Sequence, residues 1–182
     1  MEFDIKFRAF KPADAPFINK LRNDEEMESM LGGTKRYVSL ERELKWIDQL
    51  TLNDDEKNIY FAVTLIGADD IIGYASISEI DYRNGKCFWS GIKIDPQYNG
   101  KGYATQVGLK LTKFVFEELR MVKCKGEIQE HHHAALRLLE KIGYVKEGLI
   151  RAYSYKNGVH NNTWYMGMIK SEYELVKEKY KL

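Results

Sequence analysis

The sequence predicts an α+β fold, in which one mostly antiparallel, twisted sheet is flanked by helices in a single domain. Segments that alternate apolar and polar residues, or are rich in β-branched and aromatic residues, are separated by short turns, as in antiparallel sheets. Segments with helical periodicity lie before, between and after them. No repeat, low-complexity tract or Pro/Ser/Gly-rich linker divides the 182 residues. We therefore expect one domain over residues 1–182.

The first third of the chain predicts one strand and two helices. Residues 3–10 alternate apolar with polar side chains, which indicates a half-buried strand that ends at Lys11-Pro12. From Asp14 the apolar residues recur at helical spacing, and an acidic run follows. Ser39 is a helix-start residue that opens a second helical segment.

The middle of the chain predicts an antiparallel meander. Residues 59–66, 71–80 and 86–94 are rich in β-branched and aromatic side chains, which favour strands. The turn-forming residues 67–70 and 83–85 separate them. Three consecutive strands joined by tight turns are expected here.

The last part of the chain predicts a helix, a strand, a second helix, a long hairpin and a C-terminal helix. Apolar residues at helical spacing define the helices, a glycine closes the second one, and Lys156-Asn157-Gly158 is the hairpin turn. In order, the predicted elements are helix 103–119, strand 122–129, helix 134–141, strands 149–155 and 163–169, and a helix from about Ser171.

Composition excludes several classes of function. The 28 Lys and Arg balance 27 Asp and Glu, for a net charge of +1, so no overall field attracts nucleic acid or an anionic membrane. Cys87 and Cys124, in no CxxC spacing, form neither a disulfide framework nor a zinc site. The chain starts without a signal-peptide pattern and has no run of about 20 apolar residues. A cytoplasmic protein without nucleic-acid or membrane partners is expected.

A glycine-bearing loop between a strand and a helix is the clearest chemical feature. Gly100 and Gly102 precede the helix that begins near Tyr103, so backbone N–H groups and the helix dipole favour an anion such as a pyrophosphate. A dinucleotide fingerprint would need glycine at Thr105. A nucleotide P-loop would need Gly-Lys-Ser/Thr, whereas Lys101 lies between the two glycines.

Two motifs together resemble the GNAT superfamily of N-acetyltransferases. Gln97, Gly100 and Gly102 match its [Gln/Arg]-x-x-Gly-x-[Gly/Ala] signature, and residues 134–144 with Glu147-Gly148 are similar to its second motif. Nearly the whole chain takes part in the resemblance, with further matches to the branch of ribosomal-protein and spermidine N-acetyltransferases. These further matches are Arg8, Leu21-Arg22-Asn23, Ile72-Gly73 and the closing hairpin.

The resemblance implies an enzyme that uses acetyl-CoA, without a metal, to acetylate a primary amine by direct attack in a ternary complex. It places the pyrophosphate on the amides of residues 99–104 and the pantetheine along residues 92–94. His132 stands where the family has a coenzyme-binding asparagine, and an exposed helix-start histidine is the alternative. The coenzyme residues implied are Ile92, Lys93, Ile94, Gln97, Asn99, Gly100, Lys101, Gly102, Tyr103, Ala104, Thr105, His132 and Ala135.

Catalysis by proton transfer needs groups that the motifs only partly supply. Leu139 stands where many relatives have the tyrosine that protonates the leaving thiolate, so Tyr144, Tyr153 or water must serve instead. Glu79, near a strand end, is the predicted general base, with a solvated surface charge as the alternative. The adjacent histidines 131–133 do not converge as metal ligands on a helix, so no metal is expected.

The acceptor is less defined by the sequence. Asp24, Glu25, Glu26 and Glu28 suit a cationic acceptor, although a solvated helix face has the same pattern. A protein N-terminus, a polyamine or an amino-bearing small molecule all fit the resemblance, and a homodimer is possible. Because Leu139 replaces the usual proton donor, the alternative function is a non-catalytic acyl-CoA-binding or regulatory module.

Overall fold

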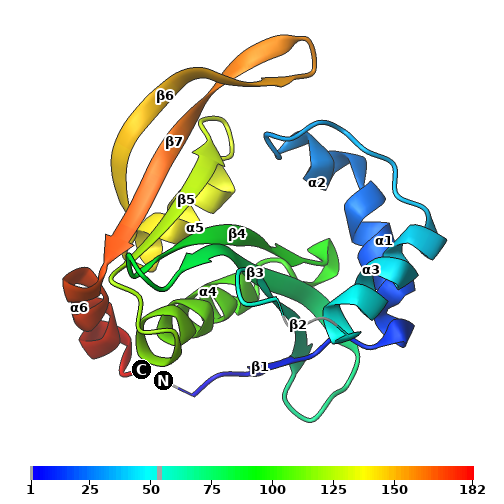
Figure 1. The fold of residues 1–182 in the computed structure, drawn as a ribbon, viewed down its shortest axis with the longest axis horizontal. Helices are drawn as coiled ribbons and strands as arrows, with labels where there is room; N and C mark the ends of the chain where they lie inside the picture. Colours follow the sequence, from blue (N-terminus) through cyan, green and yellow to red (C-terminus); the bar gives the residue numbers. More distant parts are fainter. Residues whose placement is uncertain (1, 53–54) are drawn as a thin grey trace.

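The computed structural model describes residues 2–52 and 55–182, and a seven-stranded sheet runs through it (Figure 1). The strand order is β1-β2-β3-β4-β5-β7-β6, and every neighbouring pair is antiparallel except the parallel pair β4 and β5. The predicted α+β class with a mostly antiparallel sheet is confirmed. The strands are β1 (Ile5–Arg8), β2 (Ile59–Leu65), β3 (Ile71–Asp81), β4 (Lys86–Ile94), β5 (Lys123–Gln129), β6 (Val145–Lys156) and β7 (Val159–Ile169).

Among the described residues, three α-helices, not the predicted two, lie between β1 and β2. The backbone of Asp24 is extended, with φ −68° and ψ 120°, and its side chain accepts a hydrogen bond from the N–H of Met27. Asp24 therefore ends one helix and caps the next, as a short acidic side chain does well. The helices are α1 (Ala15–Asn23), α2 (Glu25–Ser29), α3 (Leu40–Leu52), α4 (Tyr103–Lys113), α5 (His133–Lys141) and α6 (Lys170–Tyr180).

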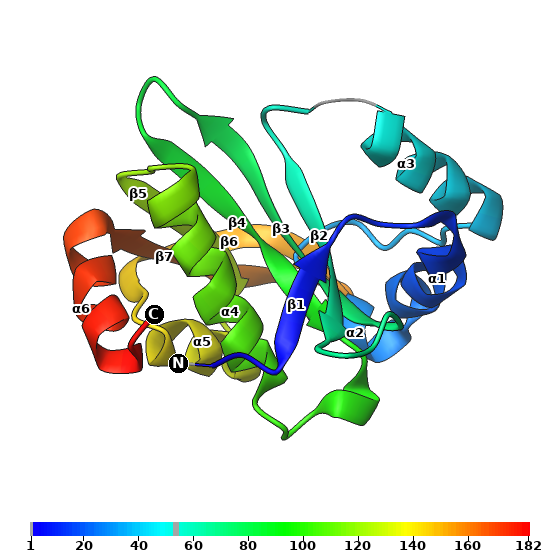
Figure 2. The ribbon, with the colours of Figure 1, turned by 90° about the horizontal axis from the view of Figure 1, so that it is seen from below.

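Helices cover both faces of the sheet (Figure 2). On one face, α4 and α5 pack Val107, Leu111 and Leu139 into the main core together with β3, β4 and β5. On the other face, a smaller core joins Ile18 of α1 and Ile47 of α3 to β2 and β3. Helices α1 to α3 therefore lie along the β1–β3 part of the sheet and leave the opposite end to the β6–β7 hairpin.

The sheet opens between β4 and β5. The two strands pair only where Lys86–Phe88 lie beside Lys123–Lys125. Beyond these residues β4 continues to Ile94 and β5 to Gln129 without pairing to each other, and Figure 1 shows them diverging. The other edge of β5 is occupied by β7. The divergence leaves the edge of β4 without a strand partner over its last residues.

Some element lengths differ from those that the sequence predicts. Strand β1 is shorter than residues 3–10, whereas both strands of the closing hairpin are longer than predicted. Helix α4 ends at Lys113 and continues as a π-helical turn, Phe114–Glu118, where one helix to residue 119 was expected. Within the described residues, no helix has the length and apolarity needed to cross a membrane.

Candidate active site

The diverging end of β4 presents backbone groups that no strand binds. The N–H of Asp95 donates to Ile72 O of β3 at 2.9 Å, and alternate residues of an antiparallel strand direct their backbone groups to the same side. The backbone of Lys93 therefore also faces β3, and the backbones of Ile92 and Ile94 face the opening. Ile92 and Ile94 are suited to pair with an extended ligand, as predicted, whereas Lys93 has no free backbone group for the predicted coenzyme contact.

The glycine loop follows directly and leads into α4. Gly100 and Gly102 have φ of 76° and 80°, a region that glycine adopts readily, and a Cβ added to either would meet no atom within 4 Å. The backbone there borders open space that a ligand can enter. Asp95 orders the start of the loop, because its side chain accepts from the N–H of Gln97 at 3.1 Å.

Positive charge and free amides coincide at the N-terminus of α4. Gly102 is the N-cap, the first turn carries no acidic residue, and its N–H groups lack intrahelical partners. Lys101 lies beside them in the loop, and Lys141 at the end of α5 donates to Thr105 Oγ1 at 3.3 Å. This arrangement fits a pyrophosphate, which needs several N–H donors and a positive field.

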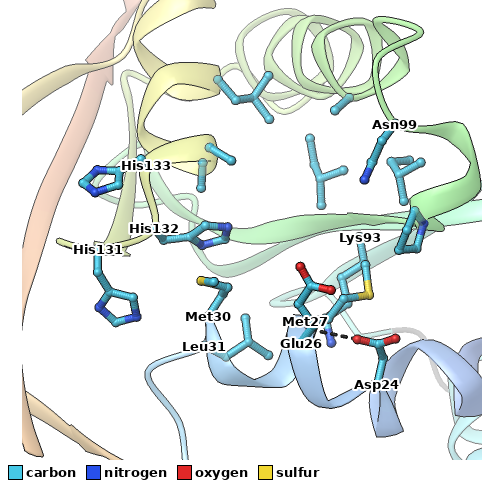
Figure 3. Close-up of a pocket in the computed structure, with 17 residues that line it drawn as sticks. Asp24, Glu26, Met27, Met30, Leu31, Lys93, Asn99, His131, His132 and His133 are labelled. Atoms are coloured by element: carbon cyan, nitrogen blue, oxygen red, sulfur yellow. Dashed lines mark hydrogen bonds between the residues drawn. The ribbon is translucent and has the colours of Figure 1, made fainter.

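The start of α5 forms the opposite side of the opening. His131, His132 and His133 line one pocket, and in Figure 3 the His132 ring extends toward the middle of that pocket. Burial, followed by the charges of His131 and His133, lowers the pKa of His132, so its imidazole is neutral near pH 7. Among residues 2–52 and 55–182, no group of three His, Cys, Asp or Glu side chains is arranged to hold a metal ion.

The pocket connects the coenzyme motifs with helix α2. It encloses about 590 Å³ and is lined by α2, the end of β4, the loop after it and the starts of α4 and α5. Of the predicted coenzyme residues, Ile92, Lys93, Ile94, Asn99, Ala104, His132 and Ala135 line it. The others lie in the loop and first helical turn outside its lining, namely Gln97, Gly100, Lys101, Gly102, Tyr103 and Thr105.

Helix α2 and the residues after it form a wall of the pocket, of which the acidic part was predicted as a possible acceptor surface and the apolar part was not. Met27, Met30 and Leu31 line the pocket with apolar side chains, and Asp24 and Glu26 line it with carboxylates (Figure 3). The acidic run drew attention to this segment, but its apolar residues at helical spacing were the signal for a buried face. Methionine suits such a wall because its flexible side chain adapts to different ligands.

The predicted general base lies outside the pocket. Glu79 occupies a bulge of β3, with φ of 50°, and its carboxylate binds Lys125 Nζ at 2.8 Å. Ala75 is the register partner of Ile92, so Glu79 lies four residues, roughly 13 Å, along the strand from the level of Ile92, which lines the pocket. This placement favours the alternative reading of Glu79 as a surface charge.

The two predicted proton donors also lie outside the pocket. Tyr144 is 2% exposed and lies inside the core beneath the sheet, with its ring centroid 5.3 Å from that of Trp89. Tyr153 is 50% exposed on β6 and donates to Glu127 Oε1 at 3.2 Å. Neither hydroxyl reaches the pocket that the coenzyme residues line, and Leu139 is buried in the core. This placement favours water, the third predicted option, as the donor of the proton.

Comparison with known proteins agrees with this geometry. The chain is 25% identical to an uncharacterized N-acetyltransferase derived from the SPbeta prophage of Bacillus subtilis, over 94% of this chain and 93% of that protein. It is 24% identical to the spermidine N(1)-acetyltransferase of Vibrio cholerae, over 95% of this chain and 97% of that protein. A crystal structure of a Vibrio cholerae spermidine N-acetyltransferase with CoA and spermine has the same fold, with a TM-score of 0.84 at 23% identity over 94% of this chain and 98% of that one.

The family assignment rests on a match over most of the chain. Residues 4–145 match the model of the acetyltransferase (GNAT) domain, which includes the glycine loop, the open edge of β4 and the start of α5. The predicted acetyl-CoA co-substrate agrees with this match. The chain therefore belongs to the GNAT acetyltransferase family and is an N-acetyltransferase.

Proposed function

We propose that the chain transfers the acetyl group of acetyl-CoA to a primary amine by direct attack in a ternary complex. The observation that carries this proposal is a pocket that joins the open edge of β4 to the wall formed by α2. An extended thioester on β4 and an amine held against α2 would meet in this pocket. Holding two reactants in contact is itself a large part of the catalysis of such a reaction.

On the coenzyme side, the chain supplies backbone donors. The amides of the glycine loop and of the first turn of α4 would bind the pyrophosphate, with Lys101 adding a positive charge. The N–H groups of Ile92 and Ile94 would bind the pantetheine and the carbonyl oxygen of the thioester. Such fixed donors stabilise the negative charge that develops on that oxygen during attack. His132, neutral and directed into the pocket, would hydrogen-bond the coenzyme.

Water carries both protons of the reaction in this proposal: the one that the amine loses and the one that the thiolate gains. The amine nitrogen attacks the carbonyl carbon, the carbon–sulfur bond breaks, and the nitrogen loses a proton while the thiolate gains one. No tyrosine is among the described residues that line the pocket. The exposed carboxylate of Glu26 lines it, and a water between Glu26 and the amine would carry the first proton away. Solvent water would protonate the thiolate, which is a good leaving group.

The acceptor is an amine small enough, or extended enough, to reach the pocket past α2. Relatives named as spermidine N-acetyltransferases support a small-molecule amine, and a protein N-terminus is the other candidate. The apolar side chains of α2 would contact the carbon skeleton of the acceptor, and its carboxylates would attract the ammonium form.

A thiol-release assay tests this function. The protein with acetyl-CoA is supplied in turn with polyamines, amino acids, amino acid amides, short peptides and amino sugars, and the acetylated product is identified by mass spectrometry. We expect thiol release that depends on at least one amine. Binding of acetyl-CoA without amine-dependent thiol release would contradict the proposal and would instead indicate a non-catalytic acyl-CoA-binding module.

A further inference from the structure

One lysine lies inside the pocket, at the position where the two reactants would meet. Lys93 is the only Lys or Arg among the described residues that line the pocket. It stands between Ile92 and Ile94, whose side chains pack into the core on the α4 face of the sheet. Because side chains alternate along a strand, the side chain of Lys93 projects from the opposite face, toward α1 and α2. Figure 3 shows it on the side of the pocket where Glu26 and Met27 lie.

The Lys93 ammonium has carboxylates in its neighbourhood but contacts none of them directly among the described residues. No ion pair or hydrogen bond joins its side chain to any residue in the ranges 2–52 and 55–182. Burial and then the Arg22 guanidinium lower its pKa, while the carboxylates of Glu28, Asp24 and Glu43 raise it. A partly buried ammonium that makes no direct contact is costly, so it is suited to receive an anionic group from a ligand.

The nearby carboxylates are already engaged elsewhere. Glu28 forms an ion pair with Lys156 of β6, and both side chains are nearly buried. Glu43 is fully buried and forms an ion pair with Arg22 at 3.3 Å between Nε and Oε1.

The third carboxylate, that of Asp24, caps α2 by accepting from the N–H of Met27 at 2.8 Å. Because none of these three carboxylates forms a hydrogen bond or ion pair with Lys93, its ammonium remains available to a molecule in the pocket.

We propose that Lys93 binds a carboxylate of the acceptor, and that the acceptor is a free α-amino acid with an apolar side chain. This inference rests on the proposed function and names its substrate class. The carboxylate would lie on Lys93, the amine toward the thioester and Glu26, and the apolar side chain against Met27, Met30 and Leu31. A polyamine lacks the carboxylate, and its several cations would be repelled by Lys93.

The test compares two acceptors that differ in the carboxylate alone. L-leucine and L-leucinamide are assayed by thiol release with the wild type, Lys93→Met, Lys93→Arg and the control Lys45→Met, which removes an exposed lysine of α3. The ratio of kcat/KM for leucine to kcat/KM for leucinamide is compared between proteins, so the different amine basicities cancel. Lys93→Met should lower this ratio at least about tenfold. Lys93→Arg should retain most of the ratio, and Lys45→Met all of it.

The possible outcomes separate this inference from the proposed function. An equal ratio in the wild type and Lys93→Met, with amine-dependent thiol release in both, overturns the carboxylate site and leaves the acetyltransferase intact. Faster turnover of spermidine than of leucine by the wild type also overturns it. If no amine releases thiol, calorimetric titration of L-leucine into the protein loaded with coenzyme A decides whether Lys93 binds a carboxylate. Binding to the wild type but not to Lys93→Met supports the site, and any other result overturns it.

Discussion

At the scale of single residues, Glu117 is the carboxylate whose protonation the fold resists most clearly. It lies in the π-helical turn after α4, binds Lys177 Nζ of α6 at 2.8 Å and accepts from the Tyr173 hydroxyl at 2.7 Å. These contacts lower its pKa from the ordinary 4.5 to about 2, against the opposite effect of burial. The folded state therefore favours the ionised form of Glu117. The contacts stabilise the folded state fully only when the pH is above the pKa that Glu117 has in the unfolded chain.

Stability should consequently fall as the pH is lowered from 4.5 to about 2. We expect the melting temperature of the wild type to drop more steeply across this range than that of Glu117→Gln, which has no proton to gain there. Glu178→Gln, an exposed change on α6, serves as the control and should follow the wild type. Thermal melts followed by circular dichroism measure this. If the melting temperatures of the wild type and Glu117→Gln fall in parallel with pH, the contacts of Glu117 contribute nothing to stability.

Residue roles were predictable from the sequence where they depend on local chemistry. The positive φ of Gly100 and Gly102 follows from a loop that must leave backbone amides exposed, and glycine is the residue that permits it. The position of Tyr144 could not be predicted in this way. It follows the turn at Gly143, and only the packing of β4, β5 and α4 decides that its ring enters the core against Trp89. The direction of the Glu79 side chain could not be predicted either, because it depends on a β-bulge in β3.

At the scale of elements, α2 and the β6–β7 hairpin are joined by a buried ion pair. Lys156 and Glu28 are 6% and 12% exposed, and Lys156 Nζ also donates to Gly33 O at 2.9 Å. This contact links residues 128 positions apart and holds the α2 wall of the pocket against the hairpin. A charge left without its partner in such a position is strongly destabilising.

We expect Lys156→Met to lower the free energy of unfolding by about 3 kcal/mol, because Glu28 then remains buried without a cation. The double variant Glu28→Met/Lys156→Met should recover part of this loss. Lys35→Met removes one partner of the exposed Lys35–Glu25 pair and should cost less than about 1 kcal/mol. Urea unfolding of the four proteins measures these differences. An equal effect of Lys156→Met and Lys35→Met would contradict the structural role of the buried pair.

Element boundaries were predictable where capping chemistry is local and less so where tertiary contacts decide. Ser39 correctly marked the start of α3, since Ser is a strong helix-capping residue. Asp24 carries the same type of signal, but the acidic run around it resembled a continuing helix, so the break before α2 was missed. The extra length of β6 and β7 comes from their pairing with each other, a contact that sequence periodicity does not report.

At the scale of the whole molecule, the proposed function depends on the parallel pairing of β4 with β5. The meander and the closing hairpin were predictable because their strands are joined by short turns. The parallel pairing of β4 with β5 joins segments separated by the glycine loop and α4. The position at which this pairing ends, after Phe88, depends on contacts between distant parts of the chain. The divergence opens the edge of β4 and brings α2, β4 and α5 around one pocket. The motifs name the residues that we expect to bind the coenzyme, but they do not predict this space.

Calorimetric titration of Gly102→Glu with acetyl-CoA tests whether the coenzyme binds through the glycine loop. Gly158→Glu is the matched control, because Gly158 has φ of 85° and equally open surroundings in the β6–β7 turn. Both variants carry the same backbone strain and added charge, but only Gly102→Glu places them where the pyrophosphate would lie. We predict acetyl-CoA binding by the wild type and Gly158→Glu, and at least about tenfold weaker binding by Gly102→Glu. Undiminished affinity in Gly102→Glu would show that the glycine loop does not hold the pyrophosphate.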